Sequence, residues 1–382
     1  MMTPVITGVR TVVVDLPSRR PHRFASHEID TQAYLVVAIT VDGEVTGVGE
    51  GVSPGGPWWG GESIEGQQAL IEHHVAPLIV GRPLQPIRQL MADVDRAVFA
   101  NPFAKAAVEM ALHDALGRLM GVPAHLLLGG GGAQRDRFPV RWALSAAAAE
   151  EVLAECEEVA AAGHSALKFK MGALPPADDL VRMARIVEGL PGHLSLLVDP
   201  NGTWDRRTAV RSVLALEEMG VDVVEQPIER RDLDGMADLV RRATRIAIMA
   251  DEGVCTPADA LAAVEARACD SIAVKVGKAG GLARARDVAT IAHTAGCRVY
   301  GGTHLESSLG TAANLQLLAA LPTPVDGTEL VGPLLLADDL TVERLEYVDG
   351  DVLVPDGPGL GVDVDWDKVA KYARTPPGDV LA

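Results

Sequence analysis

Two patterns of apolar and polar residues follow one another along the chain. Near the N-terminus, runs rich in β-branched residues predict three strands, at residues 5–15, 33–40 and 45–49. Asp42-Gly43 lies between the last two strands and is typical of a tight hairpin turn. A polar loop is expected at 17–24, and residues 62–128 are expected to be largely helical, most clearly at 104–120. These features predict a small α+β domain.

Beyond a glycine run at 129–132, short apolar runs alternate with amphipathic segments, which is typical of βα units around a parallel sheet. We predict strands at 138–144, 166–170, 194–199, 221–225, 246–251, 271–275, 298–300 and 325–329. A helix is expected to begin at Pro257, with Thr256 as its N-cap. Eight strands predict a (β/α)8 TIM-type barrel. An open doubly wound sheet is the alternative, but no G-x-G-x-x-G follows a first strand.

These patterns divide the chain into three predicted segments. The α+β domain takes residues 1–130, the barrel takes 131–340, and a C-terminal segment takes 341–382. The last segment has its own apolar stretch at 351–354 and a Pro- and Gly-rich part. We expect this segment to pack back on the first domain.

Composition narrows the class of protein. The chain has 382 residues, is 48% hydrophobic and carries a net charge of −18, which argues against partners such as nucleic acid or an anionic membrane. No apolar run is long enough to span a bilayer, and the N-terminus has no signal-peptide pattern. Its four cysteines form no CxxC pair, which suits a reducing cytoplasm and argues against a zinc cluster or disulfides.

The stretch from Ala166 to Gly172 contains the first candidate chemistry. On a strand, residues two apart point to the same face, so Lys168 and Lys170 project together. Two ammonium groups on one buried face repel each other, and burial disfavours their charge. The pattern therefore predicts an anionic group between them, or one neutral lysine. An exposed edge strand protected by lysines is the alternative interpretation.

Charged residues end four successive predicted strands. Asp199, Glu225, Asp251 and Lys275 follow one another at intervals of 26, 26 and 24 residues. Each interval is about one βα unit, so these side chains are expected together at the C-terminal end of the barrel. Three converging carboxylates repel unless a hard cation lies between them, and oxygen ligation favours Mg²⁺ or Mn²⁺ over zinc. Three surface acids in loops are the alternative interpretation.

Lys170 and Lys275 flank the predicted metal along the chain. A cation between two lysines suits a reaction in which an enolate is stabilised while a proton is delivered or removed. Positive charge nearby is expected to lower a lysine pKa toward the working pH.

Several short motifs of the chain also resemble those of a known protein family. They are Asp15-Leu16-Pro17, Arg20-Pro21-His22, Lys168-Phe169-Lys170, Asp199-Pro200-Asn201, Glu225-Gln226-Pro227, Asp251-Glu252, Val274-Lys275, Gly280-Gly281, Tyr300-Gly301-Gly302-Thr303, Leu305-Glu306 and Gly327-Thr328-Glu329. With them the chain resembles the muconate-lactonizing subgroup of the enolase superfamily nearly end to end, and is most similar to the muconate cycloisomerases. The resemblance implies a modified barrel under an α+β capping domain, and one Mn²⁺ or Mg²⁺ per subunit. It also implies cycloisomerisation of cis,cis-muconate to muconolactone in the catechol branch of aromatic degradation, by a cytoplasmic homo-oligomer, an octamer in this family.

The resemblance also implies roles for individual residues. Asp199, Glu225 and Asp251 would be the metal ligands. Lys168, Lys170 and Lys275 would serve the proton transfer, with Lys170 as the general acid, which gives syn addition. Glu306 is a further catalytic candidate, which either hydrogen-bonds a substrate carboxylate or pairs with a lysine. The substrate-binding candidates are His22, Trp59, Thr303 and His304, and Asn201 and Glu252 are expected around the ligands.

Two departures bear on the substrate. A methionine is common in the family where His304 stands, and a tyrosine is common near Trp59. The alternative interpretation of His304, Trp59 and His22 is that they pack within the protein and do not contact the substrate. The rival reactions are those of chloromuconate cycloisomerase, N-acylamino-acid racemase, o-succinylbenzoate synthase and dipeptide epimerase. For the last, Asp326-Gly327-Thr328 stands where Asp-x-Asp is usual. A non-catalytic ligand-binding homologue is the remaining alternative.

Overall fold

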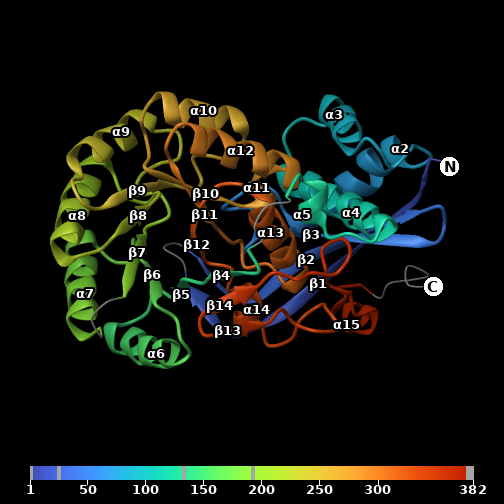
Figure 1. Ribbon diagram of the computed structural model, residues 1–382. Coiled ribbons are helices and arrows are strands. Elements are labelled where there is room, and N and C mark those ends of the chain that lie inside the picture. Colours follow the sequence, from blue (N-terminus) through green and yellow to red (C-terminus); the bar gives the residue numbers. More distant parts are fainter. Residues whose placement is uncertain (1–2, 24–26, 131–134, 191–193, 376–382) are drawn as a thin grey trace.

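The computed structural model describes residues 3–23, 27–130, 135–190 and 194–375. It has a barrel with an outer layer of helices, and an antiparallel sheet with its own helices beside it (Figure 1). This arrangement confirms the predicted barrel with an N-terminal α+β domain. Within the described ranges we find no helix that combines the length and apolarity needed to cross a bilayer.

The N-terminal domain is a three-stranded meander covered by helices. Its elements are β1 (Ile6–Arg23), β2 (Glu28–Val41), β3 (Val45–Val52), α1 (Ile64–Leu70), η1 (Ile71–Val75), α2 (Ala76–Ile79), α3 (Ile87–Ala97), α4 (Pro102–Met120) and α5 (Ala124–Leu127). The hairpin turn at Asp42-Gly43 is confirmed, with both residues in the left-handed region at φ 53° and 75°. The polar loop expected at 17–24 is wrong for residues 17–23, because β1 extends to Arg23; its pairing with β2 shifts register between Pro17 and His22 and then resumes. Phe24 lies outside the described residues.

Where β3 meets α4, the backbone of the strand packs directly against the backbone of the helix. A Cβ added to Gly47 would overlap the carbonyl oxygen of Ala111, and one added to Gly49 would overlap that of Ala107. We call these two glycines with the two alanines the glycine seam. Because the nearest atoms belong to the backbone of α4, which cannot move aside as a flexible side chain can, the seam fixes how close the helix lies to the sheet.

The barrel sheet has eight parallel strands in the order β12-β11-β10-β9-β8-β7-β6-β5. They are β5 (Trp142–Leu144), β6 (Ala166–Lys170), β7 (Ser195–Asp199), β8 (Val223–Glu225), β9 (Ala247–Ala250), β10 (Ser271–Val274), β11 (Arg298–Gly301) and β12 (Val325–Thr328). The sheet curls until its ends approach, and the backbone N–H of Arg141 donates to the carbonyl of Thr328 at 2.6 Å. Lys168 and Lys170 thus lie on an interior strand, which excludes the edge-strand interpretation.

Helices surround this sheet on the outside (Figure 1). They are α6 (Ala149–Ala161), α7 (Pro176–Gly189), α8 (Arg206–Met219), α9 (Leu233–Arg242), α10 (Pro257–Glu265), α11 (Val276–Ala279), α12 (Leu282–Thr294), α13 (Ser308–Ala320) and α14 (Gly332–Leu335). The helix expected to begin at Pro257 is confirmed as α10, with a capping box between Thr256 and Asp259.

One predicted strand is wrong. Residues 138–144 form two short strands, since β4 (Arg137–Pro139) leaves the barrel and pairs with β14 (Asp351–Leu353). Pro139 has no N–H to donate, so a sheet edge suits it. A third small sheet results from β4, β14 and β13 (Tyr347–Val348).

Several contacts join the N-terminal domain to the rest, among them one at α4 and one at α15 (Trp366–Tyr372). The carboxylate of Glu109 on α4 accepts the backbone N–H groups of Leu282 and Ala283, which open α12, at 2.6 and 3.1 Å. At the other end, α15 packs beside β1, and Arg374 pairs with Asp15 at 2.7 Å. On these contacts we propose that the 341–382 segment belongs with the N-terminal domain. Residues 376–382, and residue 131 at which the predicted barrel segment begins, lie outside the described residues.

Candidate active site

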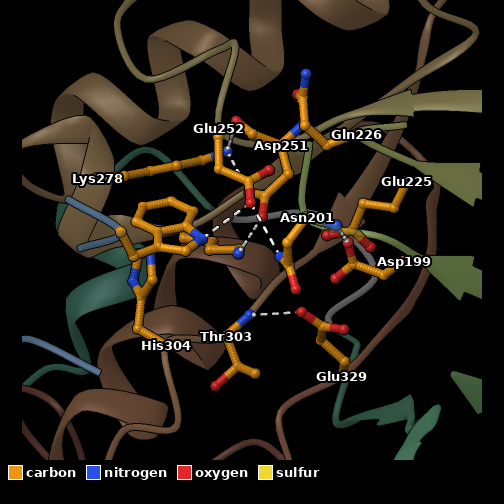
Figure 2. A network of polar contacts seen from close by, with 12 residues as sticks. Asp199, Asn201, Glu225, Gln226, Asp251, Glu252, Lys278, Thr303, His304 and Glu329 are labelled. Carbon is orange, nitrogen blue, oxygen red and sulfur yellow. Dashed lines mark hydrogen bonds and ion pairs between the residues drawn. The ribbon is translucent and has the colours of Figure 1, made fainter. Parts of the chain in front are cut away.

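Charged side chains gather at the carboxyl ends of the barrel strands (Figure 2). The predicted lysines and acids there are nearly inaccessible to solvent, with exposed fractions of 0% for Asp199 and Glu225, 1% for Asp251, 2% for Lys168 and 3% for Lys275. The alternative of three surface acids in loops is therefore excluded. The arrangement follows from the parallel sheet, which brings the same end of every strand to one side.

Lys168 lies at the centre of the acidic groups. Its Nζ is 3.0 Å from Asp199 Oδ2, 2.9 Å from Glu225 Oε2 and 2.6 Å from Glu329 Oε2. The sequence pattern predicted an anionic group beside this lysine, and three are found. The third, Glu329, follows β12 and was not among the predicted site residues.

Lys170 and Lys275 contact different carboxylates. Lys170 Nζ is 2.6 Å from Asp199 Oδ2 and 3.1 Å from Asn201 Oδ1. Lys275 Nζ is 2.6 Å from Asp251 Oδ2. One lysine comes from β6 and the other follows β10, with three strands between them in the sheet. The two ammonium groups therefore enter the site from different walls of the barrel.

Lys278 is a further buried lysine that sequence reasoning missed. It lies on the single turn of α11, and its Nζ is 2.6 Å from the carbonyl oxygen and 2.8 Å from Oδ1 of Asp251. Nothing in the sequence pattern distinguishes Lys278 from a surface lysine. Glu329 did carry a signal, because it ends a predicted strand just as Asp199, Glu225 and Asp251 do.

Burial and neighbouring charges shift the pKa values of these groups in opposite directions. Burial raises the pKa of Asp199, but the ammonium groups of Lys168 and Lys170 outweigh it and bring that pKa to about 2. Burial, with Asp199 and Glu329 nearby, raises the pKa of Glu225 well above its usual range. Burial lowers the pKa of Lys275, but Asp251 outweighs it and the net shift is upward. The pKa shift of Lys275 is thus opposite in direction to the predicted lowering, because its ammonium group contacts a carboxylate.

The donor chemistry of this cluster fits a hard divalent cation. Glu225 Oε1 is buried and accepts no hydrogen bond from the described residues. Asp199 and Asp251 both add to the electrostatic repulsion that Glu225 experiences. Among the described residues, no three acidic, histidine or cysteine side chains are arranged as a set of metal ligands. In this structure the ammonium group of Lys168 contacts both Asp199 and Glu225. The residues thus provide the buried oxygen donors such a cation needs, with an ammonium group among them.

Asn201 and Glu252 surround this cluster. Glu252 Oε1 accepts hydrogen bonds from Asn201 Nδ2 at 2.9 Å and from Trp59 Nε1 at 3.1 Å. Burial, with Asp251 and Asp199 nearby, raises the pKa of Glu252 to about 7. Trp59 thus connects the capping domain to the acidic cluster, and Lys275 Nζ lies 4.8 Å from the centre of its ring.

A cavity lies above the cluster, between the barrel and the N-terminal domain. Its lining includes nearly all of the predicted substrate and proton-transfer residues, namely His22, Trp59, Lys168, Lys170, Lys275, Thr303 and His304. Burial and the charges of Lys170 and Arg20 lower the pKa of His22 well below its usual value. Burial also lowers the pKa of His304. The cavity therefore presents neutral imidazoles beside lysine ammonium groups.

Glu306 is the predicted catalytic residue that does not line this cavity. Its carboxylate turns back on its own loop, where it accepts the backbone N–H of His304 at 2.8 Å and the hydroxyl of Thr303. Asn314 Nδ2 also donates to it, at 3.3 Å. The structure thus brings Glu306 next to the site without bringing its carboxylate into it.

A barrel with lysines and carboxylates at its strand ends, capped by an α+β domain, is the architecture of enolase-type enzymes. Residues 6–129 match the family model for the N-terminal domain of mandelate racemase and muconate lactonizing enzyme, and residues 151–368 match the enolase C-terminal domain-like model. The chain belongs to the mandelate racemase and muconate lactonizing enzyme family.

Similar proteins cover almost the whole chain. Muconate cycloisomerase 1 of Rhodococcus opacus is 46% identical over 97% of this chain and 98% of its own length. The crystal structure of 2-chloromuconate cycloisomerase from Rhodococcus opacus has a TM-score of 0.94 and 42% identity, and covers 97% of this chain and 100% of that one. Muconate lactonizing enzyme from Pseudomonas fluorescens, complexed with muconolactone, has a TM-score of 0.94 and 34% identity, with coverage of 98% and 100%.

Proposed function

We propose that this protein is an isomerase that converts cis,cis-muconate to muconolactone. The observation that supports the proposal most is the pair Lys170 and Lys275, which reach one cavity from different walls of the barrel, in a chain 46% identical to a muconate cycloisomerase. Muconate carries both reacting groups, because one carboxylate attacks the alkene conjugated with the other. The enzyme gains by holding that near-attack geometry.

We propose that positively charged residues stabilise the product of this attack. As the new C–O bond forms, negative charge develops on the second carboxylate. Lys168, fully buried at the floor of the cavity, contributes positive charge where it develops. Bound by Asp199, Glu225 and Asp251, an Mn²⁺ or Mg²⁺ ion would add further charge stabilisation at the same carboxylate.

The carbon next to that carboxylate then needs a proton. We assign its delivery to Lys170, whose Nζ is held by Asp199 and Asn201, and we assign to Lys275 a contribution of charge from the other side. Delivery from Lys170 gives syn addition. His22, Trp59, Thr303 and His304 would shape the cavity around the substrate. We further propose a cytoplasmic enzyme that assembles as a homo-oligomer, such as an octamer.

Two measurements test the proposal. In the presence of Mn²⁺, the protein should remove the ultraviolet absorbance of the conjugated diene of muconate. In D₂O, deuterium should appear on the face of muconolactone that also carries the new C–O bond. Deuterium on the opposite face would transfer the acid role to Lys275. Turnover of N-acyl amino acids or dipeptides without turnover of any muconate would refute the function itself.

Chloromuconate cycloisomerisation is a second candidate. The specific support is the 42% identity to the chloromuconate cycloisomerase of Cupriavidus pinatubonensis, which covers 95% of this chain. Comparing kcat/KM for muconate and its 2- and 3-chloro derivatives decides between the two. A higher kcat/KM for a chlorinated substrate would favour the second candidate.

A further inference from the structure

Two side chains of the N-terminal domain hold one loop of the barrel mouth. Ser307 donates to the buried carboxyl of Glu50, through its backbone N–H to Oε1 at 3.1 Å and through its hydroxyl to Oε2. The hydroxyl of Tyr34 donates to the carbonyl of Leu305 at 2.6 Å. Tyr34 and Glu50 lie on the same face of the sheet, because Glu50 pairs across the strands with Val36, two residues from Tyr34. We call residues 303–307 the mouth loop.

The mouth loop is shaped to receive these groups. Leu305 has φ 61°, a conformation that a residue with a side chain adopts only when its surroundings enforce it. A Cβ on Gly310 would overlap Glu50 Oε1, so a glycine is required where the carboxyl rests on the first turn of α13. Ser307 is also the N-cap of that helix and accepts from Leu309 N at 3.1 Å.

The same loop carries three residues of the cavity, Thr303, His304 and Leu305. Thr303 and His304 are both held by the carboxylate of Glu306, the residue next to Ser307. The His304 ring packs against Trp59 with 4.6 Å between ring centres. A displacement of Ser307 would therefore move the residues that face the substrate.

The surroundings of Glu50 favour its neutral form. Burial, together with the nearby acids Glu306 and Asp339, raises the pKa of Glu50 to about 8, against the hydrogen bonds from Ser307 that lower it. Tyr34 is the other titratable group beside it. Among the described residues no cation forms an ion pair with Glu50. Ionisation would place a further negative charge in this buried acidic region.

We propose that neutral Glu50 is a positioning residue for the reaction, which holds the mouth loop so that Thr303 and His304 face the substrate, and that its ionisation loosens this hold. The assignment rests on the proposed function and adds to it a coupling between the N-terminal domain and the cavity. Glutamine is uncharged like the protonated acid. Its Oε1 accepts from Ser307 N, and its Nε2 donates to Ser307 Oγ, which is the direction that the bond takes when the proton of the neutral acid is on Oε2.

The pH dependence of kcat/KM tests this. We expect the parent to lose about tenfold per pH unit above pH 8 through Glu50. Glu50→Gln should keep the neutral-pH value within about threefold and lose this alkaline decline. An unchanged alkaline decline in Glu50→Gln would overturn the proposal. If that variant does not fold, Tyr34→Phe decides, because it removes the contact to Leu305: a several-fold rise in KM supports the proposal and an unchanged KM overturns it.

Asp339→Asn is a matched control. Asp339 accepts the backbone N–H and hydroxyl of Ser308, one residue further along α13, at 3.0 and 2.6 Å. It makes the same kind of buried bond, but from outside the N-terminal domain and outside the mouth loop. We expect this variant to unfold at a lower temperature and still to show an alkaline decline, with its midpoint at a lower pH because the Asp339 charge that raises the pKa of Glu50 is gone. Loss of the decline here as well would assign it to general destabilisation and overturn the role of Glu50.

A fluorescence titration separates this inference from the proposed function, because it needs no substrate. The Trp59 signal, taken as the difference between the parent and Trp59→Phe, should show two changes. One, near pH 7, belongs to Glu252, which accepts a hydrogen bond from Trp59 Nε1, and is removed by taking all spectra on a Glu252→Gln background. The other should have its midpoint near pH 8 and should be absent when Glu50→Gln is added. A change that persists with Glu50→Gln overturns the inference. A titration that follows Glu50 in a protein without activity on any muconate refutes the proposed function and leaves the positioning role supported.

Discussion

Lys278 gives the sharpest test of how the acidic cluster is held together. Its ammonium group contacts both the side chain and the backbone carbonyl of Asp251, and the two side chains are 2% and 1% exposed. Methionine has nearly the same length and shape but cannot donate a hydrogen bond. Lys278→Met should therefore leave two oxygen atoms of Asp251 without this donor, in a region that water does not reach.

The expected cost follows from these contacts. Removing one partner of a buried, hydrogen-bonded ion pair costs about 3–5 kcal/mol. Lys275 remains 2.6 Å from Asp251 Oδ2, so part of the carboxylate charge stays compensated. We expect a loss near the lower end, about 3 kcal/mol. Since native proteins are stable by only about 5–15 kcal/mol, such a loss is large.

Urea unfolding of the metal-free protein, extrapolated linearly to water, measures this loss. Lys105→Met is a suitable control, because Lys105 is also buried but pairs in the N-terminal domain with Asp95, which is 26% exposed. We expect a smaller loss there, since water reaches the carboxylate left behind. Equal free energies of unfolding for Lys278→Met and the parent would refute the reasoning, and so would equal losses in both variants.

Three further predictions follow from the site and the barrel. Glu225→Gln should weaken Mn²⁺ binding by about tenfold or more, measured by calorimetry, because it removes a charged oxygen donor; unchanged affinity would contradict the metal site. Trp59→Ala should change the ratio of kcat/KM values among muconates more than the melting temperature, whereas a fall in melting temperature alone would mean packing. The backbone N–H groups of Arg245 and Ile246 lower the pKa of Glu217 to about 2, so its stabilisation is present above pH 4.5 and lost as pH falls toward 2. The difference in unfolding free energy between parent and Glu217→Gln should shrink across that range, and a constant difference would exclude this assignment.

The parts of the fold that could be predicted are those in which local pattern and tertiary packing agree. Four successive βα units place a charged residue at the end of the strand or directly after it, at the mouth of the barrel, so Asp199, Glu225 and Asp251 could be located from spacing alone. Asp251 and Lys275 in fact lie one residue beyond β9 and β10, where the side chains leave the sheet and enter the cavity.

The parts that could not be predicted depend on partners distant in sequence. Pro17 and Pro21 suggested a loop, yet β1 is an edge strand, where a residue without an N–H is tolerated. Pairing with β2 then carries the strand on to Arg23. Similarly, the direction of the Lys275 pKa shift depends on a 2.6 Å contact with Asp251 that no pattern specifies.

The glycine seam between β3 and α4 has a consequence for how this protein can evolve. Glycine is the smallest residue, so any substitution at Gly47 or Gly49 adds atoms where the backbone of α4 already lies. Every substitution at these two positions therefore enlarges the side chain, and a larger side chain pushes α4 away from the sheet. Glu50 lies next to Gly49 on β3 with its side chain on the opposite face, so the contact between β3 and α4 also fixes the position of Glu50. The residues around the substrate can therefore diversify while the cap that holds them stays unchanged.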